Sequence, residues 1–398
     1  MGVFHLQYPH ANDSIPQFAG GADDWEEMME FEKPNYSKKE VVEAGKSLKG
    51  AIRSVDADAL RVFRIAHNWR SSYVRPMYVV RQELLGKVRK IDGAATAARL
   101  KRMQSIRRKL KKTPLTLYQI QDIGGCRAIV DSVQEARALL QRYKDGDSRH
   151  HPIREDNYVL EPKRDGYRSF HLVLKFNGDG PDEIYNRQTI ELQIRTRLQH
   201  AWSTAVESVG LVRNENLKHG EGDTDWLRLF QIMAAEFAIE EKCPLVAQVS
   251  ENAKERRKEL KDLDRRLKAA ESLDSYRHVI NFVDRAYTRS NRFFLLTYYH
   301  DKKMVTIRPF ISFREGTTNL ENAELKDESS SGVNTVLVQA EKVEDLKAAF
   351  PNYFLDVKLF AQRLHAVLQG RQIRPIKSTP VKSAPALDHS WVREYGKR

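Results

Sequence analysis

The spacing of apolar residues along the chain changes several times, and each change marks a different kind of secondary structure. From Lys38 to Gly93 apolar residues recur at helical spacing among strong helix formers, which predicts long helices. A second, strongly basic helix is predicted over 97–112, ending before Pro114. We therefore expect a helical N-terminal part with basic outer faces.

Downstream of this helical part the pattern changes to short apolar runs that alternate with helical spacing. Strands are predicted at 126–130, 156–162, 170–177 and 189–196, and helices at 133–145 and from about 197 to 210. Such alternation implies an α/β fold in which a mixed β-sheet is flanked by helices.

The C-terminal part of the chain begins with a helical pattern and then returns to strands. Trp226, Phe230, Met233 and Phe237 form one apolar stripe at helical spacing. A short leucine pattern at 260–267 follows, which fits a hairpin packed within the monomer or a short coiled coil. Further strands are predicted at 292–299, 304–310 and 334–340, and a closing helix at 355–369.

These patterns divide the chain into five predicted segments. They are a loose N-terminal arm at 1–36, an α/β domain with basic N-terminal helices at 37–222, a helical connector or hairpin at 223–290, a small α/β accessory domain at 291–369 and a disordered basic tail at 370–398.

The composition of the chain argues against a membrane protein, a secreted protein and a zinc-binding protein. No apolar run approaches the roughly 20 residues of a membrane span, and the N-terminus has no secretory signal, so we expect a cytoplasmic protein without membrane contact. Cys126 and Cys243 lack the neighbours needed for a zinc site and are predicted to be reduced core thiols.

The positive charge of the chain is regional. Its formal net charge is +13, and between Arg61 and Lys112 we count 16 Lys and Arg against Glu83 and Asp92, a balance of +14. A field of this sign attracts nucleotide phosphates or RNA, although a solvated helical face has the same composition.

Candidate chemistry is concentrated on the predicted strands. Period-two alternation over 189–196 places Glu191, Gln193 and Arg195 on one face. Asp122 lies just before the strand at 126–130, where Gly124 and Gly125 leave room for a ligand. Two carboxylates on paired strands suit Mg²⁺ bound to substrate phosphates, whereas a plain salt-bridged surface is the alternative for such a strand alone.

The segment at 162–171 adds an aromatic plate. Tyr167, Ser169 and His171 alternate onto one face, so the tyrosine can stack on a base while Lys163 and Arg168 meet phosphates. On the predicted basic helix, Ser105 and Lys109 share a face with Lys101, and Arg99 lies close by; this face suits a triphosphate.

Five segments, RLKRMQSIRRKL, DIGGCR, PKRDGYRSFH, ELQIRT and QHAW, resemble in their order the RelA/SpoT-type alarmone synthetase domain, and above all the small single-synthetase members. The resemblance covers about residues 95–210. It implies a fold related to the nucleotidyltransferases and transfer of pyrophosphate from ATP to the 3′-hydroxyl of GDP or GTP, which makes (p)ppGpp. The metal-dependent hydrolase motifs of bifunctional members are missing from the sequence, so we expect no hydrolase activity.

The resemblance also implies roles for individual residues. Asp122 would hold Mg²⁺, and Glu191 would be a second metal ligand or the base that activates the 3′-hydroxyl. Tyr167 would stack on the acceptor base. The residues expected to bind ATP or its phosphates are Arg99, Lys101, Lys109 and Arg127, and those expected to position the acceptor are Lys163, His171, Gln193 and Arg195.

Two alternatives stay open at the level of the sequence. Some relatives are toxins that pyrophosphorylate the 3′ CCA end of tRNA, and here the C-terminal domain would act as a restraint, with an antitoxin or a regulatory ligand as its partner. The third reading is an inactive module that binds RNA or a protein partner. Homo-oligomerisation is compatible with each of these functions.

Overall fold

The computed structural model describes residues 31–50, 57–279, 281–284, 293–299, 301–302, 304–327, 333–339 and 357–371. Most of the expected N-terminal arm and nearly all of the expected basic tail lie outside these residues. Within the described part of the chain, no helix combines the length and the apolar character that a membrane crossing requires.

Three helices occupy the region where helical spacing is predicted. They are α2 (Lys38–Lys49), α3 (Ala57–Ser71) and α4 (Val74–Val88). Helix α2 begins at a capping box, in which the Ser37 hydroxyl accepts the N–H of Glu40 and the Glu40 carboxylate accepts the N–H of Ser37 at 3.0 Å. The predicted helical N-terminal part is confirmed.

The basic segment at 97–112 is not one helix. Strand β1 (Ala95–Leu100) comes first, and helix α5 begins only at Met103 and ends at Lys112. All six residues of β1 pair with the strand β2 (Gly124–Val130), and this pairing buries Ala97, Ala98 and Leu100. Sheet pairing therefore overrides the local helix propensity, and Arg99 and Lys101 do not share a helix face with the residues of α5.

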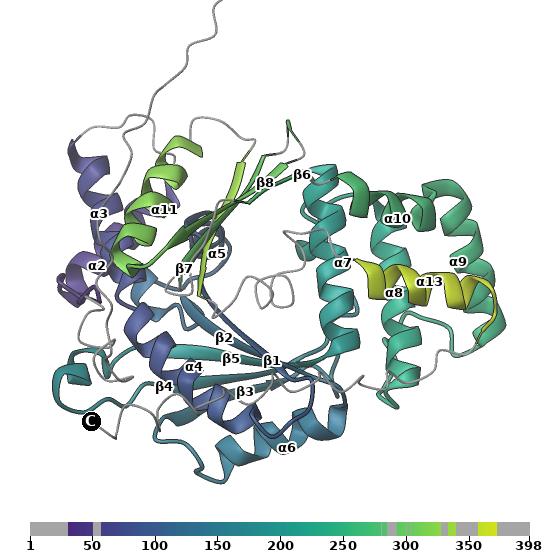
Figure 1. Ribbon diagram of the computed structural model, residues 1–398, viewed down its shortest axis with the longest axis horizontal. Coiled ribbons are helices and arrows are strands. Elements are labelled where there is room, and N and C mark those ends of the chain that lie inside the picture. Colours follow the sequence, from purple (N-terminus) through teal and green to yellow (C-terminus); the bar gives the residue numbers. More distant parts are fainter. Residues whose placement is uncertain are drawn as a thin grey trace, which may run out of the picture. The chain divides into compact units, whose positions relative to one another are not determined.

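One mixed sheet organises the fold (Figure 1). Its strand order is β3-β4-β5-β2-β1-β9-β7-β8-β6, with the pairs β2/β5 and β6/β8 parallel and the others antiparallel. The remaining strands are β3 (His151–Asn157), β4 (Phe170–Lys175), β5 (Thr189–Thr196), β6 (Asn281–Asp284), β7 (Phe293–Tyr299), β8 (Met304–Phe310) and β9 (Val333–Gln339). This arrangement confirms the predicted α/β class.

Strand β3 is displaced from its prediction. The expected strand at 156–162 starts earlier, at His151, and ends at Asn157. There the Asn157 side chain accepts the N–H of Leu160 at 3.1 Å, and its carbonyl accepts the N–H of Glu161 at 3.0 Å. These two bonds close a turn, so the apolar residues at 158–160 leave the sheet.

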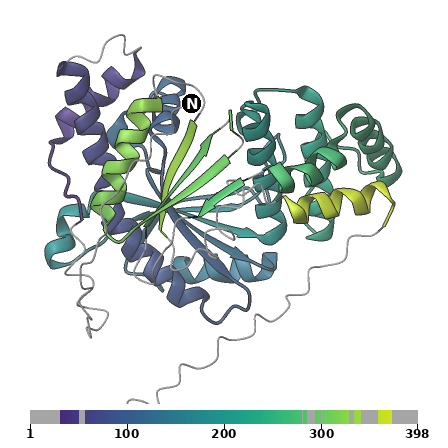
Figure 2. The ribbon, with the colours of Figure 1, turned by 45° about the horizontal axis from the view of Figure 1, so that its top comes forward.

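The remaining helices lie on and beside this sheet. They are α6 (Val133–Lys144), α7 (Arg197–Arg213), α8 (Thr224–Glu240), α9 (Ala253–Leu267), α10 (Ala269–Val279), α11 (Phe313–Asp327) and α13 (Lys358–Leu368). Short 3₁₀ turns lie at Leu117–Gln119, Gly180–Tyr185 and Leu217–His219. Helix α11, which the sequence does not signal, contacts β7, β8 and β9 (Figure 2).

Helices α7, α8, α9, α10 and α13 share one apolar core. The predicted stripe of α8 lies within it, because Trp226, Phe230, Met233 and Phe237 are all buried. Leu260 and Leu263 of α9 are buried in the same core, so the leucine pattern packs within the monomer. Cys126 and Cys243 are also buried and free, as predicted.

The segment expected to form an accessory domain at 291–369 contributes strands to the same sheet as the segment at 37–222. Strand β9 pairs with β1, with Ala98 opposite Gln339 and Arg99 opposite Val338. The sheet is therefore continuous across the expected domain boundary, because one edge of β1 needs a partner strand. The boundaries themselves stay predictions.

Candidate active site

The polar residues of the candidate site are brought together by three neighbouring strands. In the parallel pair β2/β5, Gly125 lies opposite Glu191 and Arg127 lies opposite Gln193. On the other side of β5, strand β4 places His171 opposite Gln193. The alternation predicted for β5 is observed, since Ile190, Leu192 and Ile194 are fully buried. The polar face of β5 is thus available to a ligand.

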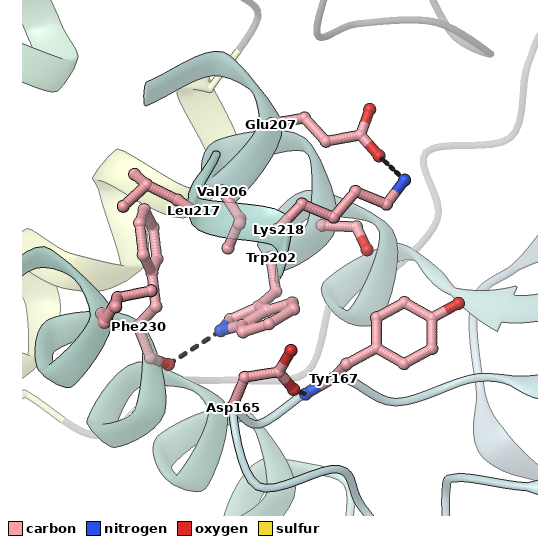
Figure 3. A pocket seen from close by; sticks show the side chains of 10 residues that line it. Asp165, Tyr167, Trp202, Val206, Glu207, Leu217, Lys218 and Phe230 are labelled. Carbon is pink, nitrogen blue, oxygen red and sulfur yellow. Dashed lines mark hydrogen bonds and ion pairs between the residues drawn. The ribbon is translucent and has the colours of Figure 1, made fainter. Parts of the chain in front are cut away.

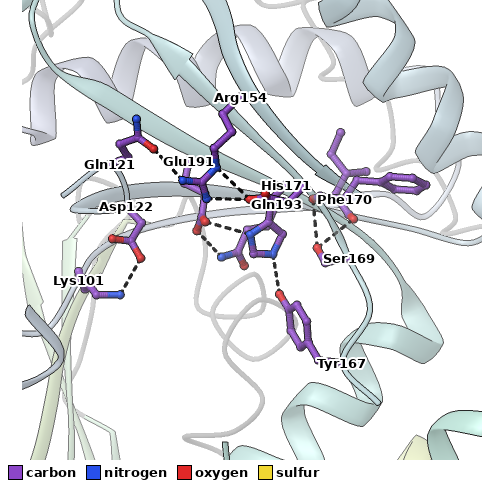
Figure 4. Close-up of polar contacts among 12 residues, drawn as sticks. Lys101, Gln121, Asp122, Arg154, Tyr167, Ser169, Phe170, His171, Glu191 and Gln193 are labelled. Atoms are coloured by element: carbon purple, nitrogen blue, oxygen red, sulfur yellow. Dashed lines mark hydrogen bonds and ion pairs between the residues drawn. The ribbon is translucent and has the colours of Figure 1, made fainter. Parts of the chain in front are cut away.

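A closed ring of hydrogen bonds joins five side chains on this face, and Figure 4 shows four of them, Tyr167, His171, Glu191 and Gln193. His171 bonds through Nδ1 to Glu191 Oε1 at 2.9 Å and through Nε2 to the Tyr167 hydroxyl at 2.7 Å. Gln193 donates to Glu191 Oε2 at 2.6 Å, and Arg195 donates to Gln193 Oε1 at 2.9 Å and to the Tyr167 hydroxyl at 2.6 Å. Each side chain of the ring is therefore fixed by two others.

The ring holds Glu191 in its charged form. Burial by itself raises the pKa of this carboxyl, but the hydrogen bond and charge of His171 and the hydrogen bond from Gln193 outweigh burial. The pKa of Glu191 consequently lies well below its usual value.

The second carboxylate, Asp122, lies between two ammonium groups. Lys101 donates to Asp122 Oδ2 and Lys109 donates to Oδ1, both at 2.9 Å. Burial raises the pKa of Asp122, yet these two lysines outweigh it and bring the pKa below its ordinary value. Lys101 lies in the loop after β1 and Lys109 lies on α5, so they do not share the helix predicted for them. They nevertheless bind the same carboxylate.

Nearly all the predicted residues line one cavity of about 360 Å³. Those that line it are Arg99, Lys101, Lys109, Asp122, Arg127, Lys163, Tyr167, His171, Glu191, Gln193 and Arg195. Ser105 lines an adjoining cavity of about 660 Å³, which shares Lys101, Lys109 and Asp122 with the first. The two cavities thus meet at the Asp122 carboxylate.

Arg168 does not line either cavity. Its side chain is 3% exposed and donates to the carbonyl of Val159 at 3.1 Å and to that of Pro244 at 2.5 Å. The residue follows Tyr167 in the chain, and its side chain lies on the opposite side. In this structure Arg168 ties two loops together instead of facing phosphates.

Tyr167 is held by its surroundings on several sides (Figure 3). Its ring makes an edge contact with Trp202, which donates to the carbonyl of Phe230 at 2.8 Å. Lys163 Nζ lies 5.0 Å from the ring centroid and Arg195 Cζ lies 5.1 Å from it. A base stacking on this ring would therefore meet two cations as well.

Cationic side chains dominate the electrostatics of the cavity. Burial, followed by the charges of Arg195 and Arg99, lowers the pKa of Arg127 to about 9. The Glu207 carboxylate offsets only part of this crowding of like charges. The remaining crowding favours a polyanionic ligand in the space between these arginines.

Several residues that line the cavity of about 360 Å³ are not among the site residues predicted from the sequence. Lys218 and His219 come from the turn after α7, and Arg154 comes from β3. Glu207 of α7 pairs with Lys218 at 2.5 Å. Glu207 raises the pKa of Lys218, but partial burial and the charges of the nearby arginines outweigh it and bring this pKa below its ordinary value. No local motif marks these positions, because only the packing of α7 and its turn against the sheet brings them to the cavity.

The side chains that could act as metal ligands determine whether a metal ion fits the site. Among the described residues, no cluster of three or more His, Cys, Asp or Glu side chains could hold an ion without other ligands. Asp122 and Glu191 face the same cavity, and the Glu191 charge acts on the Asp122 carboxyl. Two carboxylates fit Mg²⁺, which binds through one or two carboxylates together with waters and substrate phosphates.

Comparison with known proteins shows which proteins the sequence of this chain is similar to. Residues 98–210 match the model of the region found in RelA / SpoT proteins. The chain is 31% identical over 149 residues to the GTP pyrophosphokinase of Escherichia coli K12, covering 35% of this chain and 18% of that protein. It is 38% identical over 104 residues to the GTP pyrophosphokinase rsh of Brucella melitensis, covering 26% of this chain and 13% of the relative. The chain thus spans less than a fifth of these relatives.

Solved structures give similar matches over a larger share of the chain. A GTP pyrophosphokinase family protein from Streptococcus pneumoniae is 23% identical with a TM-score of 0.36, and the match covers 43% of this chain and 86% of the other. Small alarmone synthetase 1 from Bacillus subtilis, bound to its product pppGpp, is 21% identical with a TM-score of 0.37, covering 44% and 93%. Residues 98–210 are thus similar to the region found in RelA / SpoT proteins and to curated GTP pyrophosphokinases.

Proposed function

We propose that the cavity transfers pyrophosphate from ATP to the 3′-hydroxyl of GDP or GTP, making (p)ppGpp. One observation carries the proposal above all: eight Lys and Arg side chains line a single cavity together with Asp122, Glu191 and Tyr167. Phosphoryl-type transfer depends mainly on positioning and charge neutralisation, and such a set of side chains provides both. The similarity of residues 98–210 to GTP pyrophosphokinases supports the same reaction.

The two connected cavities suggest that the donor nucleotide and the acceptor nucleotide bind at different places. Arg99, Lys101, Lys109 and Arg127 would bind the ATP phosphates, with Ser105 contacting ATP in the adjoining cavity. The acceptor nucleotide would lie over the opposite part of the sheet, at the residues joined by the hydrogen-bond ring. There Tyr167 would stack on the base, and His171, Gln193, Arg195 and Lys163 would orient the sugar and its phosphates.

Asp122 and Glu191 would hold Mg²⁺, which would neutralise charge on the pyrophosphoryl group during transfer. Alternatively, Glu191 would accept the proton of the 3′-hydroxyl, since its two oxygens are oriented by His171 and Gln193. Lys101 and Lys109, which now bind Asp122, would turn toward phosphates.

The purified full chain, γ-labelled ATP and Mg²⁺ are sufficient for a direct test. GDP, GTP or deacylated tRNA is supplied as the acceptor in separate reactions. Label that moves to GDP or GTP supports the proposal. Label that moves only to the tRNA end overturns it in favour of the toxin reaction, and native protein that transfers no label to any acceptor overturns it in favour of a binding module.

Glu191→Gln gives a residue-level check of the mechanism. We expect it to reduce transfer about a hundredfold or more, because the base is lost, while ATP binding is largely kept. The matched control is Glu155→Gln on β3, where the carboxylate pairs with Lys144 at 2.8 Å and does not line the cavity. Substantial residual turnover in Glu191→Gln would contradict the assigned role.

A further inference from the structure

The connection between β1 and α5 carries much of the positive charge of the cavity. Arg99 is the last but one residue of β1, Lys101 follows the strand, and α5 then presents Lys109. Lys101 and Lys109 meet at Asp122 only if the connection and the start of the helix have a fixed geometry.

Helix α5 lacks a local cap. Its N-cap residue is Arg102, whose side chain makes no capping hydrogen bond and has no acceptor to offer the free N–H groups of the first turn. The backbone N–H of Met103 instead donates to Glu324 Oε1 at 3.1 Å, and Glu324 belongs to α11. The carboxylate at this helix N-terminus therefore comes from a residue 221 positions away in the sequence.

Glu324 is itself rigidly held. Arg70 of α3 donates through NH1 to both of its oxygens, at 2.9 and 2.8 Å. The Arg70 side chain is 0% exposed and that of Glu324 is 12% exposed. A buried, charge-assisted contact of this kind fixes the carboxylate in position, so Glu324 can transmit that position to α5.

Two further contacts, both from β9, hold the connection between β1 and α5. Asn334 of β9 accepts a hydrogen bond from Arg102 at 2.7 Å. Val338 lies opposite Arg99 where β9 pairs with β1. Asn334 also lines the larger cavity beside Lys101 and Lys109. Strand β9 and helix α11 thus hold the connection at both of its ends.

We propose that Glu324 is a positioning residue for the nucleotide donor: it fixes the start of α5, with help from Asn334, and so places Lys101 and Lys109. The identity of the donor as ATP rests on the proposed function. The segment that carries α11 and β9 therefore supports catalysis and is not solely a restraint or sensor.

Hydrogen exchange of the ligand-free full chain tests the positioning directly. We expect amides of residues 101–109 to exchange at least about fivefold faster in Glu324→Ala than in the wild type. Glu324→Gln keeps an acceptor for the Met103 N–H and should restore much of the protection. The matched control is Glu321→Ala, one turn earlier on α11, where the carboxylate lies 3.5 Å from His67 Nδ1.

Steady-state kinetics then connect the positioning to the reaction. Glu324→Ala is expected to raise the KM for ATP about three- to tenfold. The KM for GDP or GTP should stay within about twofold of the wild type, since the β4/β5 residues are not affected. If Glu324→Ala does not fold, Asn334→Ala replaces it, and the same donor-side effect is expected.

Two results would overturn the inference. One is unchanged exchange at 101–109, and the other is an equal rise of both KM values with a loss of thermal stability well beyond that of Glu321→Ala. A wild-type chain that transfers no label refutes the proposed function instead, and the exchange comparison still decides whether Glu324 positions α5.

Discussion

The glycine before Tyr167 offers a sharp test of how the site is built. Gly166 has φ +96°, and a Cβ added there would lie 2.5 Å from Ala234 Cβ on α8. Gly166→Ala therefore combines an unfavourable backbone conformation with a steric overlap. Gly146 at φ +84° is the matched control, because a Cβ there would meet no atom within 4 Å.

The expected energies can be separated into these two contributions. A non-glycine residue at such a φ is destabilised by about 1–2 kcal/mol, and this contribution applies to both variants. Ala234 is part of a buried helix and cannot yield as a flexible side chain would, so the overlap adds about 1–3 kcal/mol in Gly166→Ala. We expect Gly166→Ala to be less stable than Gly146→Ala by about this second amount.

Urea unfolding followed by tryptophan fluorescence measures the difference, since Trp202 lies beside Tyr167. Adding Ala234→Gly to Gly166→Ala removes the overlapping atom and should recover about 1 kcal/mol or more relative to the additive expectation. Gly166→Ala should also raise the KM for the acceptor. Equal destabilisation by Gly166→Ala and Gly146→Ala, without coupling to Ala234→Gly, would refute the idea that the turn is fixed against α8.

Two further predictions concern buried charges outside the cavity. Arg168→Ala should destabilise the fold by about 1–3 kcal/mol in urea unfolding, because the carbonyls of Val159 and Pro244 lose their donor, while the KM values stay nearly unchanged. Burial raises the pKa of Glu240 to about 7 despite the opposing charge of Arg363. The folded state then binds more protons than the unfolded state, so thermal stability should fall as the pH rises from about 4.5 to 7, and Glu240→Gln should flatten this decline.

The parts of the site that the sequence predicts are those with local periodicity. In β5, the alternation of Ile190, Leu192 and Ile194 with polar residues identifies both the strand and its working face, because burial on one side of a sheet imposes a period of two. This rule does not reach Arg168, which lies before β4 begins. The prediction that it meets phosphates rests on its charge, whereas its hydrogen bonds to the carbonyls of Val159 and Pro244 hold it away from the cavity.

Other features depend on partners that are distant in the sequence. The strand β1 forms within a basic segment of high helix propensity because β2 and β9 pair with both of its edges. Lys218 enters the cavity through the turn after α7, which no motif marks. The charged sequence of α11 has little apolar periodicity, yet its Leu320 is buried and its Glu324 reaches α5.

The position of β1 in the sheet also affects how the chain folds during synthesis. Residues 98 and 99 pair with residues 339 and 338, so one edge of β1 has no partner until more than two hundred further residues have been made. At about 5–20 residues per second, that interval lasts roughly ten seconds or longer. A nascent chain exposes unpaired N–H and C=O groups on this edge throughout the interval, and such edges promote aggregation. The adjoining cavity of about 660 Å³, which Val333 and Asn334 help to line, can take its final form only after nearly the whole described chain has emerged from the ribosome.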